Sequence, residues 1–493
     1  MWDIFRPLVK EITTQELEVK GYIPPCLSGT LYRIGPNALY PSPHNSHFFD
    51  GHGMIHSISF REGKPVEYRN RWVQTQAYMT ERQAGRFLFS GVGQPDLLGQ
   101  FIRFARYFIS SDSKDILRRW WQNHPRRISD FSPFANVANT NIEWHNGKLL
   151  ALWDGGFPYE VTPELETIGK VDFGTKVPRH ALGFCAHPKI DNDTGELLGI
   201  GTSLLPPYWF YYVINPDGSL ARVCPIPIEQ MSFIHDFAVT KNYAIAIDIP
   251  LSFSIVDIVK GVGTFRWNQE RPTRIGYWSR KEHGEMSVRW IETEGFFFLH
   301  TAGAYEEADG TIVVLLCRYP SSPLGMSTCA AQKFRSSGEF QERGVLVKLK
   351  IDPQRGSVIQ EQLDDWSVEF PALENQSLGA KANNIYFLAT DSAFNFNAKV
   401  GIRKLDLERG TSSFWQPEPG QIPGEPIFIP ATETSYRKGW IVTVVADRTL
   451  QQSRVVILDP ESIESGPIGE VILPVMLPMT FHGLWLSEKS KAQ

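Results

Sequence analysis

Short apolar or alternating runs, separated by frequent turns, follow one another along most of the chain. In residues 141–153, the pair Asn146-Gly147 separates two such runs, and this pair favours the positive backbone angles of a tight hairpin turn. Paired runs of the same kind occupy residues 296–317, 400–415 and 439–459. Many short strands joined by turns predict an all-β fold, either a propeller or a large sandwich. No repeat of fixed period is visible.

One segment has a different period. In residues 96–124 the apolar positions recur at helical spacing, and Arg103 and Arg106 fall on the other face. Trp120 and Trp121 follow two further arginines. Two interpretations stay open: a helix packed on the β body, or a helix on a membrane surface with its aromatics inserted and its arginines facing phosphates.

Composition narrows the class of protein. The 493 residues are 42% hydrophobic and 21% charged, as in an ordinary globular protein. The net charge of -5, without a basic run, gives nucleic-acid binding no electrostatic support. The five scattered cysteines form no CxxC pair and fit a reducing compartment. Without a signal-peptide core or a long apolar window, we expect a cytoplasmic protein, with a peripheral membrane contact left open.

Four of the twelve histidines share a sequence context and are candidate metal ligands: His187, His235, His300 and His482. Each follows an apolar or small segment, at an expected strand end or inner loop. They are too far apart in the chain for one helix or loop, so only a closed or radial sheet could bring them to one point. Imidazole is the usual ligand for iron, copper, zinc and nickel. The alternative is that each histidine is a core residue with an ordinary hydrogen-bond partner.

A second group of histidines crowds a short segment: His44, His47, His52 and His56. Proline, asparagine, serine and glycine lie between them, which is typical of a polar loop before a strand. We therefore prefer the other four as metal ligands.

Three carboxylates lie in apolar surroundings. They are Asp154, Glu369 and Glu425, and acids in such runs are rarely buried without a partner. A metal-bound histidine usually donates its other N–H to a carboxylate, so these acids are candidate partners of the histidines. The alternative is a turn-capping role, which Asp154 before two glycines also fits. No nucleophile elbow, phosphate loop or dinucleotide fingerprint is present.

Nine segments, in order from about residue 20 to the C-terminus, resemble the signatures of the carotenoid cleavage oxygenases, most closely the cyanobacterial apocarotenoid oxygenases. They are SGTLYRIGPN (28–37), FFDGHGMIH (48–56), ANTNI (138–142), LLALWDGG (149–156), AHPKID (186–191), FIHDFAVT (233–240), EFP (369–371), GEPIFIP (424–430) and FHGLW (481–485). Together these motifs are highly specific.

The resemblance implies one seven-bladed β-propeller domain over residues 1–493, with a helical cap over the active-site face and a helical membrane-docking insertion at residues 86–128. It implies a non-haem Fe(II) ion on the propeller axis, with His300 ending an inner strand and pointing at this axis. The residues it assigns to the site are the ligands His187, His235, His300 and His482, the orienting carboxylates Asp154, Glu369 and Glu425, and Thr140, whose methyl group lies beside a vacant iron position.

Three departures from the family pattern are visible. Asp154 replaces a glutamate and is one methylene shorter, so either water bridges it to its histidine or its loop moves inward. Ala302-Gly303 stands where a small residue and an asparagine are usual, and His52 replaces an acid. None of the three is an expected ligand, so we expect iron binding to be kept.

The function implied is cleavage by O2 of one C=C bond of a carotenoid or apocarotenoid, giving aldehyde or ketone products such as retinal-like compounds. So apolar a substrate would come from a membrane through an aromatic-lined tunnel, which favours peripheral membrane association. Alternatives in the same superfamily are cleavage of a stilbene-type phenylpropanoid and isomerisation of a retinoid ester. A non-catalytic carrier of apolar ligands is an alternative from another class.

Overall fold

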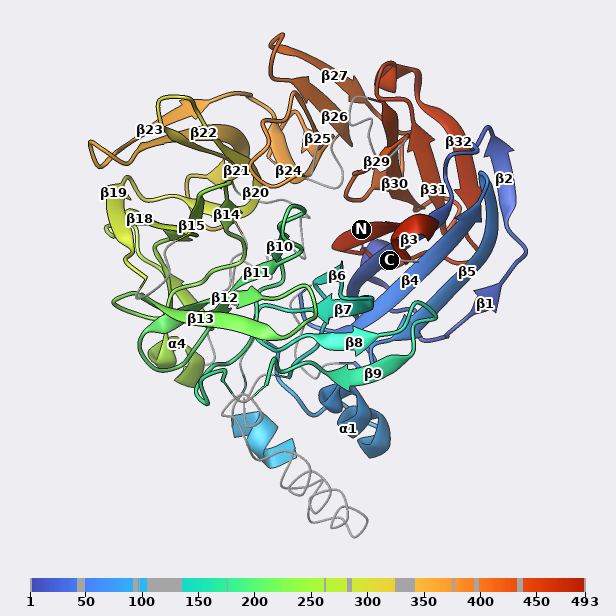
Figure 1. The fold of residues 1–493 in the computed structure, drawn as a ribbon. Coiled ribbons are helices and arrows are strands. Elements are labelled where there is room, and N and C mark those ends of the chain that lie inside the picture. The colour runs from blue at the N-terminus through green and yellow to red at the C-terminus, as the bar shows by residue number, and fades with distance from the viewer. Residues whose placement is uncertain are drawn as a thin grey trace.

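The computed structural model describes residues 2–41, 49–91, 96, 98–103, 135–174, 176–260, 263–281, 286–323, 342–374, 377–393, 399–431 and 438–491. Within these ranges, seven antiparallel sheets surround one centre (Figure 1). The chain is therefore a seven-bladed β-propeller, as predicted.

Blade 1 combines the two ends of the chain. Its strand order is β1 (Thr13–Thr14), β5 (Lys64–Trp72), β4 (His52–Arg61), β3 (Gly29–Asn37) and β33 (His482–Ser487). Blade 2 contains β6 (Asn141–His145), β7 (Lys148–Leu152), β8 (Tyr159–Val161) and β9 (Thr167–Lys170). Blade 3 contains β10 (Lys189–Ile190), β11 (Leu197–Thr202), β12 (Tyr208–Ile214) and β13 (Leu220–Pro227).

Blades 4 to 7 continue around the ring. Blade 4 contains β14 (Ala238–Val239), β15 (Tyr243–Asp248), β18 (Thr273–Ser279) and β19 (Arg289–Thr293), with a separate ribbon of β16 (Leu251–Phe253) and β17 (Phe265–Trp267). Blade 5 contains β20 (Phe297–Glu306), β21 (Ile312–Tyr319), β22 (Val345–Asp352) and β23 (Ser357–Gln362). Blade 6 contains β24 (Ser367–Leu373), β25 (Asn384–Thr390), β26 (Val400–Asp406) and β27 (Thr411–Trp415). Blade 7 contains β2 (Glu18–Gly21), β32 (Pro467–Ile472), β31 (Gln452–Leu458), β30 (Gly439–Asp447), β28 (Gln421–Pro423) and β29 (Ile427–Pro430).

The expected hairpins are present. Asn146 and Gly147 join β6 to β7 with φ values of 52° and 70°, the positive pair that a two-residue hairpin turn requires. The paired runs at 296–317, 400–415 and 439–459 form β20–β21, β26–β27 and β30–β31. Local sequence therefore specifies the units from which the blades are built.

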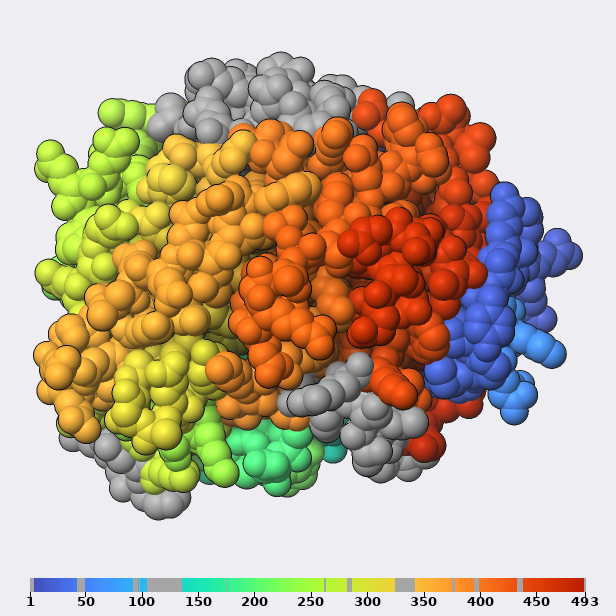
Figure 2. Space-filling model, turned by 90° about the horizontal axis from the view of Figure 1, so that it is seen from above, coloured from blue at the N-terminus to red at the C-terminus, as the bar shows by residue number. Residues whose placement is uncertain are grey.

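The ring is closed at both ends of the chain. The C-terminal β33 pairs with β3, with Ile34 opposite His482, and the N-terminal β2 pairs with β32, with Glu18 opposite Ile472. Figure 2 shows the N-terminal segment in blue lying beside C-terminal strands in red. The C-terminal β33 thus completes blade 1, which is otherwise N-terminal, and the N-terminal β2 completes blade 7, which is otherwise C-terminal. These two pairings close the ring.

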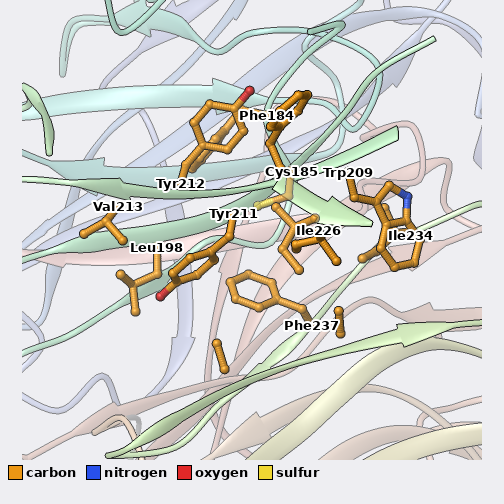
Figure 3. Packing of buried hydrophobic residues seen from close by; sticks show 14 of the residues in the cluster. Phe184, Cys185, Leu198, Trp209, Tyr211, Tyr212, Val213, Ile226, Ile234 and Phe237 are labelled. Carbon is orange, nitrogen blue, oxygen red and sulfur yellow. The ribbon is translucent and has the colours of Figure 1, made fainter. Parts of the chain in front are cut away.

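The hydrophobic core lies between the blades. In the cluster of Figure 3, Phe184 and Tyr212 pack edge to face, with ring centroids 5.6 Å apart, and Tyr211 packs on Trp278 of blade 4. Both faces of β12 are covered in this way, which explains its nearly continuous apolar sequence. Full burial of one such side chain contributes about 1.5–3 kcal/mol.

Helical structure is sparse in the described part of the chain. The helical elements there are η1 (Trp2–Phe5), α1 (Gln76–Ala84), α4 (Ile255–Val259), η3 (Ile463–Ser465) and α6 (Glu488–Lys491). Residues 98–103 are also helical, whereas residues 104–128 of the expected insertion lie outside the described residues, as do Arg106, Trp120 and Trp121. The Arg103 guanidinium donates to the Leu88 carbonyl and pairs with Asp96, so it is not directed at lipid phosphates. Among the described residues, no helix is both long and apolar enough to cross a membrane.

Candidate metal centre

The four histidines come from four different blades. His187 lies two residues before the inner strand β10, His235 lies three residues before the inner strand β14, and His482 is the first residue of β33. His300 lies inside β20, so the expectation that it ends its strand was wrong. β20 continues beyond His300 to Glu306, and its pairing with β21 is irregular around this residue.

Two bulges orient the side chains of blades 5 and 6. The register of β20 against β21 shifts between Phe298 and Thr301, on either side of His300. In β24 the register shifts between Glu369 and Ala372, where Phe370 has a φ of 55°. A bulge redirects a side chain within a strand, and a phenylalanine with positive φ is a strained conformation that persists where the surroundings enforce it. Both bulges thus lie at predicted site residues.

The Nε2 atoms of the four histidines face one another. The distance is 3.0 Å from His187 to His235, 3.2 Å from His235 to His300 and 3.2 Å from His300 to His482. All four ligand atoms lie within 4.8 Å of one another, and no other such group of three or more potential ligands occurs in the part of the chain that the structure describes. The propeller therefore brings together the four residues selected from the sequence.

Three carboxylates hold three of the rings. Asp154 Oδ2 lies 2.7 Å from Nδ1 of His235, Glu369 Oε2 lies 2.5 Å from Nδ1 of His300, and Glu425 Oε1 lies 2.7 Å from Nδ1 of His482. An ionised carboxylate can only accept, so each Nδ1 donates to its carboxylate, and in the neutral ring Nε2 then presents a lone pair to the centre. These are the three acids chosen from the sequence, and the turn-capping alternative for Asp154 does not hold.

Asp154 reaches its histidine directly. Its second oxygen, Oδ1, accepts the backbone N–H of Ala186 at 2.9 Å, one residue before His187. The shorter side chain therefore needs no bridging water, and the same carboxylate contacts the segments of two histidines.

The other two carboxylates have partners that the sequence motifs did not identify. Tyr319 donates its hydroxyl to Glu369 Oε1 at 2.8 Å, and the fully buried Arg33 donates to Glu425 Oε2 at 2.6 Å. Arg33 also donates to the Phe481 carbonyl, next to His482. The sequence did contain one indication that Arg33 has a buried partner: it is a charged residue within an apolar strand, where an unpaired charge is rare.

The surroundings favour neutral imidazole at two positions. Burial and the neighbouring histidines hold the pKa of His187 well below its usual range. Burial lowers the pKa of His482 to about 4, although Glu425 acts in the opposite direction. Burial also lowers the pKa of His235, but Asp154 and other carboxylates outweigh it and raise the pKa above its usual value. Only the neutral ring can bind a metal through Nε2. Because the pKa of His235 is raised and those of His187 and His482 are lowered, metal binding would compete with a proton mainly at His235.

This donor set fits a transition-metal ion. With metal–nitrogen bonds of about 2.1 Å, two ligands at right angles have their nitrogens about 3 Å apart, and the three Nε2–Nε2 separations in the structure agree. Neutral imidazoles suit iron, copper, zinc and nickel, and carboxylates on the outer nitrogens are the usual support of such ligands.

A large cavity borders the centre. Its volume is about 880 Å³, and it is bordered by His235, His300 and His482 but not by His187. Aromatic side chains form much of its wall, including Phe49, Phe87, Phe89, Trp153, Phe233, Phe265, Phe370 and Phe481. Phe370 packs on two of the imidazoles, with its ring centroid 5.3 Å from that of His300 and 5.2 Å from that of His482. The aromatic wall could not be selected from the sequence, because its members come from most of the blades.

Thr140 also borders this cavity. Its hydroxyl is 3.1 Å from Asn139 Oδ1, and Asn139 in turn donates to the carbonyls of Phe49 and Gly51. The hydroxyl is therefore occupied within the protein. A position of its methyl group beside a metal stays a prediction.

The histidines of the second group have other partners. His52 Nε2 lies 2.9 Å from Glu81 Oε2, and His56 Nδ1 lies 3.0 Å from the Tyr68 hydroxyl. Both histidines lie in β4 rather than in a loop. The remaining two, His44 and His47, are outside the described residues.

Fold and site together define a propeller protein with a four-histidine candidate metal centre supported by three carboxylates. The family model described as retinal pigment epithelial membrane protein matches residues 5–487. Carotenoid 9,10(9',10')-cleavage dioxygenase 1 of Phaseolus vulgaris is 30% identical over 98% of this chain and 89% of that protein. Apocarotenoid-15,15'-oxygenase of Synechocystis is 30% identical over 95% of this chain and 92% of that protein. The chain belongs to this family, the carotenoid cleavage dioxygenases, as the motifs predicted.

Solved structures agree with this assignment. Cobalt-substituted Synechocystis apocarotenoid oxygenase superposes with a TM-score of 0.81 at 27% identity, covering 99% of this chain and 98% of that one. The lignostilbene dioxygenase of Pseudomonas brassicacearum superposes with a TM-score of 0.82 at 25% identity, covering 98% of this chain and 97% of that one.

Proposed function

We propose that this protein is a non-haem iron dioxygenase that cleaves one C=C bond of a carotenoid or apocarotenoid with O2, giving two aldehyde or ketone products. The observation that carries the proposal is the convergence of four imidazole Nε2 atoms at the wall of a large apolar cavity. Membership of the carotenoid cleavage dioxygenase family supports the reaction class.

In this proposal His187, His235, His300 and His482 hold a ferrous ion, which supplies the redox chemistry that makes O2 reactive toward an electron-rich double bond. The imidazoles are neutral ligands, so the compensating negative charge comes from the three carboxylates on their outer nitrogens. Arg33 offsets part of the charge of Glu425, with which it forms a buried ion pair.

The cavity residues position the substrate and exclude water. A flat, apolar wall suits a rigid polyene, and holding one double bond next to the centre is the main contribution required of the protein. No lysine or arginine borders the cavity among the described residues, and the polar groups of Asn139 and Thr140 are occupied by protein partners. A phenolic substrate would need polar groups, and Tyr40, Tyr208 and Gln230 also border the cavity. The preference for a carotenoid over a stilbene therefore rests on the carotenoid-cleaving relatives, although a lignostilbene dioxygenase is a structural relative.

Product analysis with and without iron tests the proposal. Protein loaded with Fe(II) is expected to convert members of a panel of carotenoids and apocarotenals into two carbonyl fragments, each with one oxygen atom from ¹⁸O2 by mass spectrometry. Resveratrol-like stilbenes in the same panel should remain uncleaved. Chelation of the iron should abolish turnover and readdition of Fe(II) should restore it, because the imidazoles alone cannot activate O2.

Two outcomes would contradict the proposal. One is full activity in protein from which iron has been rigorously removed. The other is binding of carotenoids without O2 consumption, which would indicate an apolar-ligand carrier.

We further propose that the protein docks peripherally on membranes to collect its substrate. Exposed apolar side chains on two helical segments support this: Leu98, Phe101, Ile255, Val256 and Val259. The α4 residues border the cavity themselves. Residues 98–103 are tied to the cavity wall, because Arg103 donates to Ser90 Oγ and Ser90 borders the cavity. A lipid surface that covers both segments would lie against the edge of the cavity.

Charged substitutions test the docking. Phe101→Glu and Val259→Glu are expected to lower co-sedimentation with phospholipid vesicles severalfold, because each places a charge where a 71% or 76% exposed apolar side chain would enter lipid. Ile359→Glu is the matched control, since Ile359 is 64% exposed in β23, away from the cavity. Wild-type vesicle binding in both test variants would exclude this docking surface. Phe108, another apolar position of the segment 96–124, lies outside the described residues.

A further inference from the structure

Three of the four histidine segments share a second contact that involves none of the imidazoles. Lys189 lies two residues after His187 and Asp236 one residue after His235, and Thr301 follows the third histidine directly. The side chain of Asp236, which is only 2% exposed, contacts both of the others. Segments from blades 3, 4 and 5 are thus joined through one carboxylate.

The carboxylate of Asp236 accepts four hydrogen bonds. Oδ1 accepts Nζ of Lys189 and the backbone N–H of Phe237, each at 2.7 Å. Oδ2 accepts both the backbone N–H and the hydroxyl of Thr301, each at 2.7 Å. Hydrogen bonds to an ionised acceptor are the strong class, and four of them fix a buried carboxylate in one orientation.

The contact matters most for His187. No carboxylate contacts this ring among the described residues, unlike the other three histidines. Its segment is tied to blade 2 through Ala186, which donates to Asp154 and accepts from Asn141. Two side-chain ties join this segment to blade 4: the bond between Lys189 and Asp236, and, farther along the chain from His187, an ion pair between Asp191 and Arg280.

The Thr301 contact acts at the bulge of β20. Thr301 follows His300, in the stretch where the register against β21 shifts. A bulge interrupts the regular ladder and leaves local freedom, and the two bonds from Thr301 to Asp236 remove it. The direction of the His300 side chain therefore depends on a residue of the neighbouring blade.

We propose that Asp236 is a positioning residue for the metal centre, which acts with Lys189 and Thr301 to set the spacing of the imidazoles of His187, His235 and His300. The inference rests on the proposed function, since it assumes that these imidazoles bind a metal. Asp236 itself is not a ligand. Its hydrogen bonds to Lys189 and Thr301 fix the segments that follow His187 and His300 relative to its own segment, which follows His235.

Cobalt binding provides the test. Apo-protein is titrated with Co(II) alone, its affinity is measured by competition with a chromophoric chelator, and the visible absorption bands of Co(II) report the ligand arrangement. Asp236→Asn is expected to change the bands and to lower the affinity by up to about 10-fold, the lower end of the range for a partner that bonds a ligand directly, because Asp236 contacts no imidazole. Lys189→Met and Thr301→Val, which remove one partner each, should give smaller losses.

The conservative variant and a matched control separate positioning from general stability. Thr301→Ser keeps both donors to Asp236 and should bind Co(II) like the wild type, whereas Thr301→Val should not. Asp364→Asn breaks another buried ion pair, with Arg403, whose two residues do not border the cavity. This control should lower the melting temperature while its Co(II) affinity and spectrum remain those of the wild type.

The possible results are distinct. If Asp236→Asn does not fold, two other results test the positioning role. They are the comparison of Thr301→Val with Thr301→Ser, and the Co(II) affinity of Lys189→Met. Wild-type affinity and bands in Thr301→Val and Lys189→Met would overturn the positioning role and leave the proposed function intact. Failure of the wild-type protein to bind either Co(II) or Fe(II) would overturn both.

Discussion

Replacement of His300 by alanine is expected to abolish stoichiometric iron binding and to reduce carotenoid cleavage by more than about 100-fold. Loss of a partner outside the ligand set typically costs 10- to 100-fold in metal affinity, and removal of a ligand should cost more. The substitution also leaves the buried carboxylate of Glu369 without the ring N–H that it accepts at 2.5 Å. Iron content by mass spectrometry and initial rates of product formation measure the two effects.

His145→Gln is the control for this experiment. His145 is as buried as His300, but it lies outside the cavity and its Nε2 is 3.0 Å from the Gly195 carbonyl. Glutamine can still donate to that carbonyl, so iron content and rate should remain near the wild type. Iron retention and unchanged turnover in His300→Ala would remove His300 from the centre and refute the four-histidine arrangement.

A chain that ends at Phe481 is expected not to fold as a propeller. It lacks β33, which forms six residue pairs with β3 and closes the ring. At about 1 kcal/mol for each backbone hydrogen bond, the lost ladder alone is comparable to the roughly 5–15 kcal/mol that stabilises a typical domain. Absence of a cooperative thermal transition by circular dichroism, together with low solubility, is the expected result.

Two further chains separate ring closure from loss of the histidine in β33. A chain that ends at Ser487 keeps β33 and removes only α6 and the following residues, and no α6 residue is buried, so it should melt cooperatively near the wild-type temperature. Full-length His482→Ala keeps the strand and should also fold, while losing metal. A cooperative wild-type-like transition in the chain ending at Phe481 would show that β33 is not required for closure.

Local sequence determined the β-hairpins of this protein. The Asn146-Gly147 turn and the paired apolar runs specify hairpins because strand and turn preferences act between near neighbours, and these hairpins are present. The all-β class followed from the same pattern. The number of blades did not, since no regular repeat marks them, and it came from the family resemblance alone.

The candidate ligands could also be selected from the sequence. The four histidines and the three acids each have apolar neighbours in the sequence. Burial of a polar group costs free energy unless it has a partner, so such positions indicate a site. What the sequence could not assign was their partners. That Asp154 pairs with His235, rather than with another ring, depends on which blades meet around the centre.

Other features were decided by the tertiary structure alone. The partners of Arg33 and Asp236, the bulge at His300 and the aromatic cavity wall all involve segments brought together by the closed ring. Nothing in the local sequence encodes these contacts, because they form only when β33 and β2 join the two ends of the chain. The sequence by itself determined the strands and the residues able to bind a metal; ring closure determined that they meet at one point.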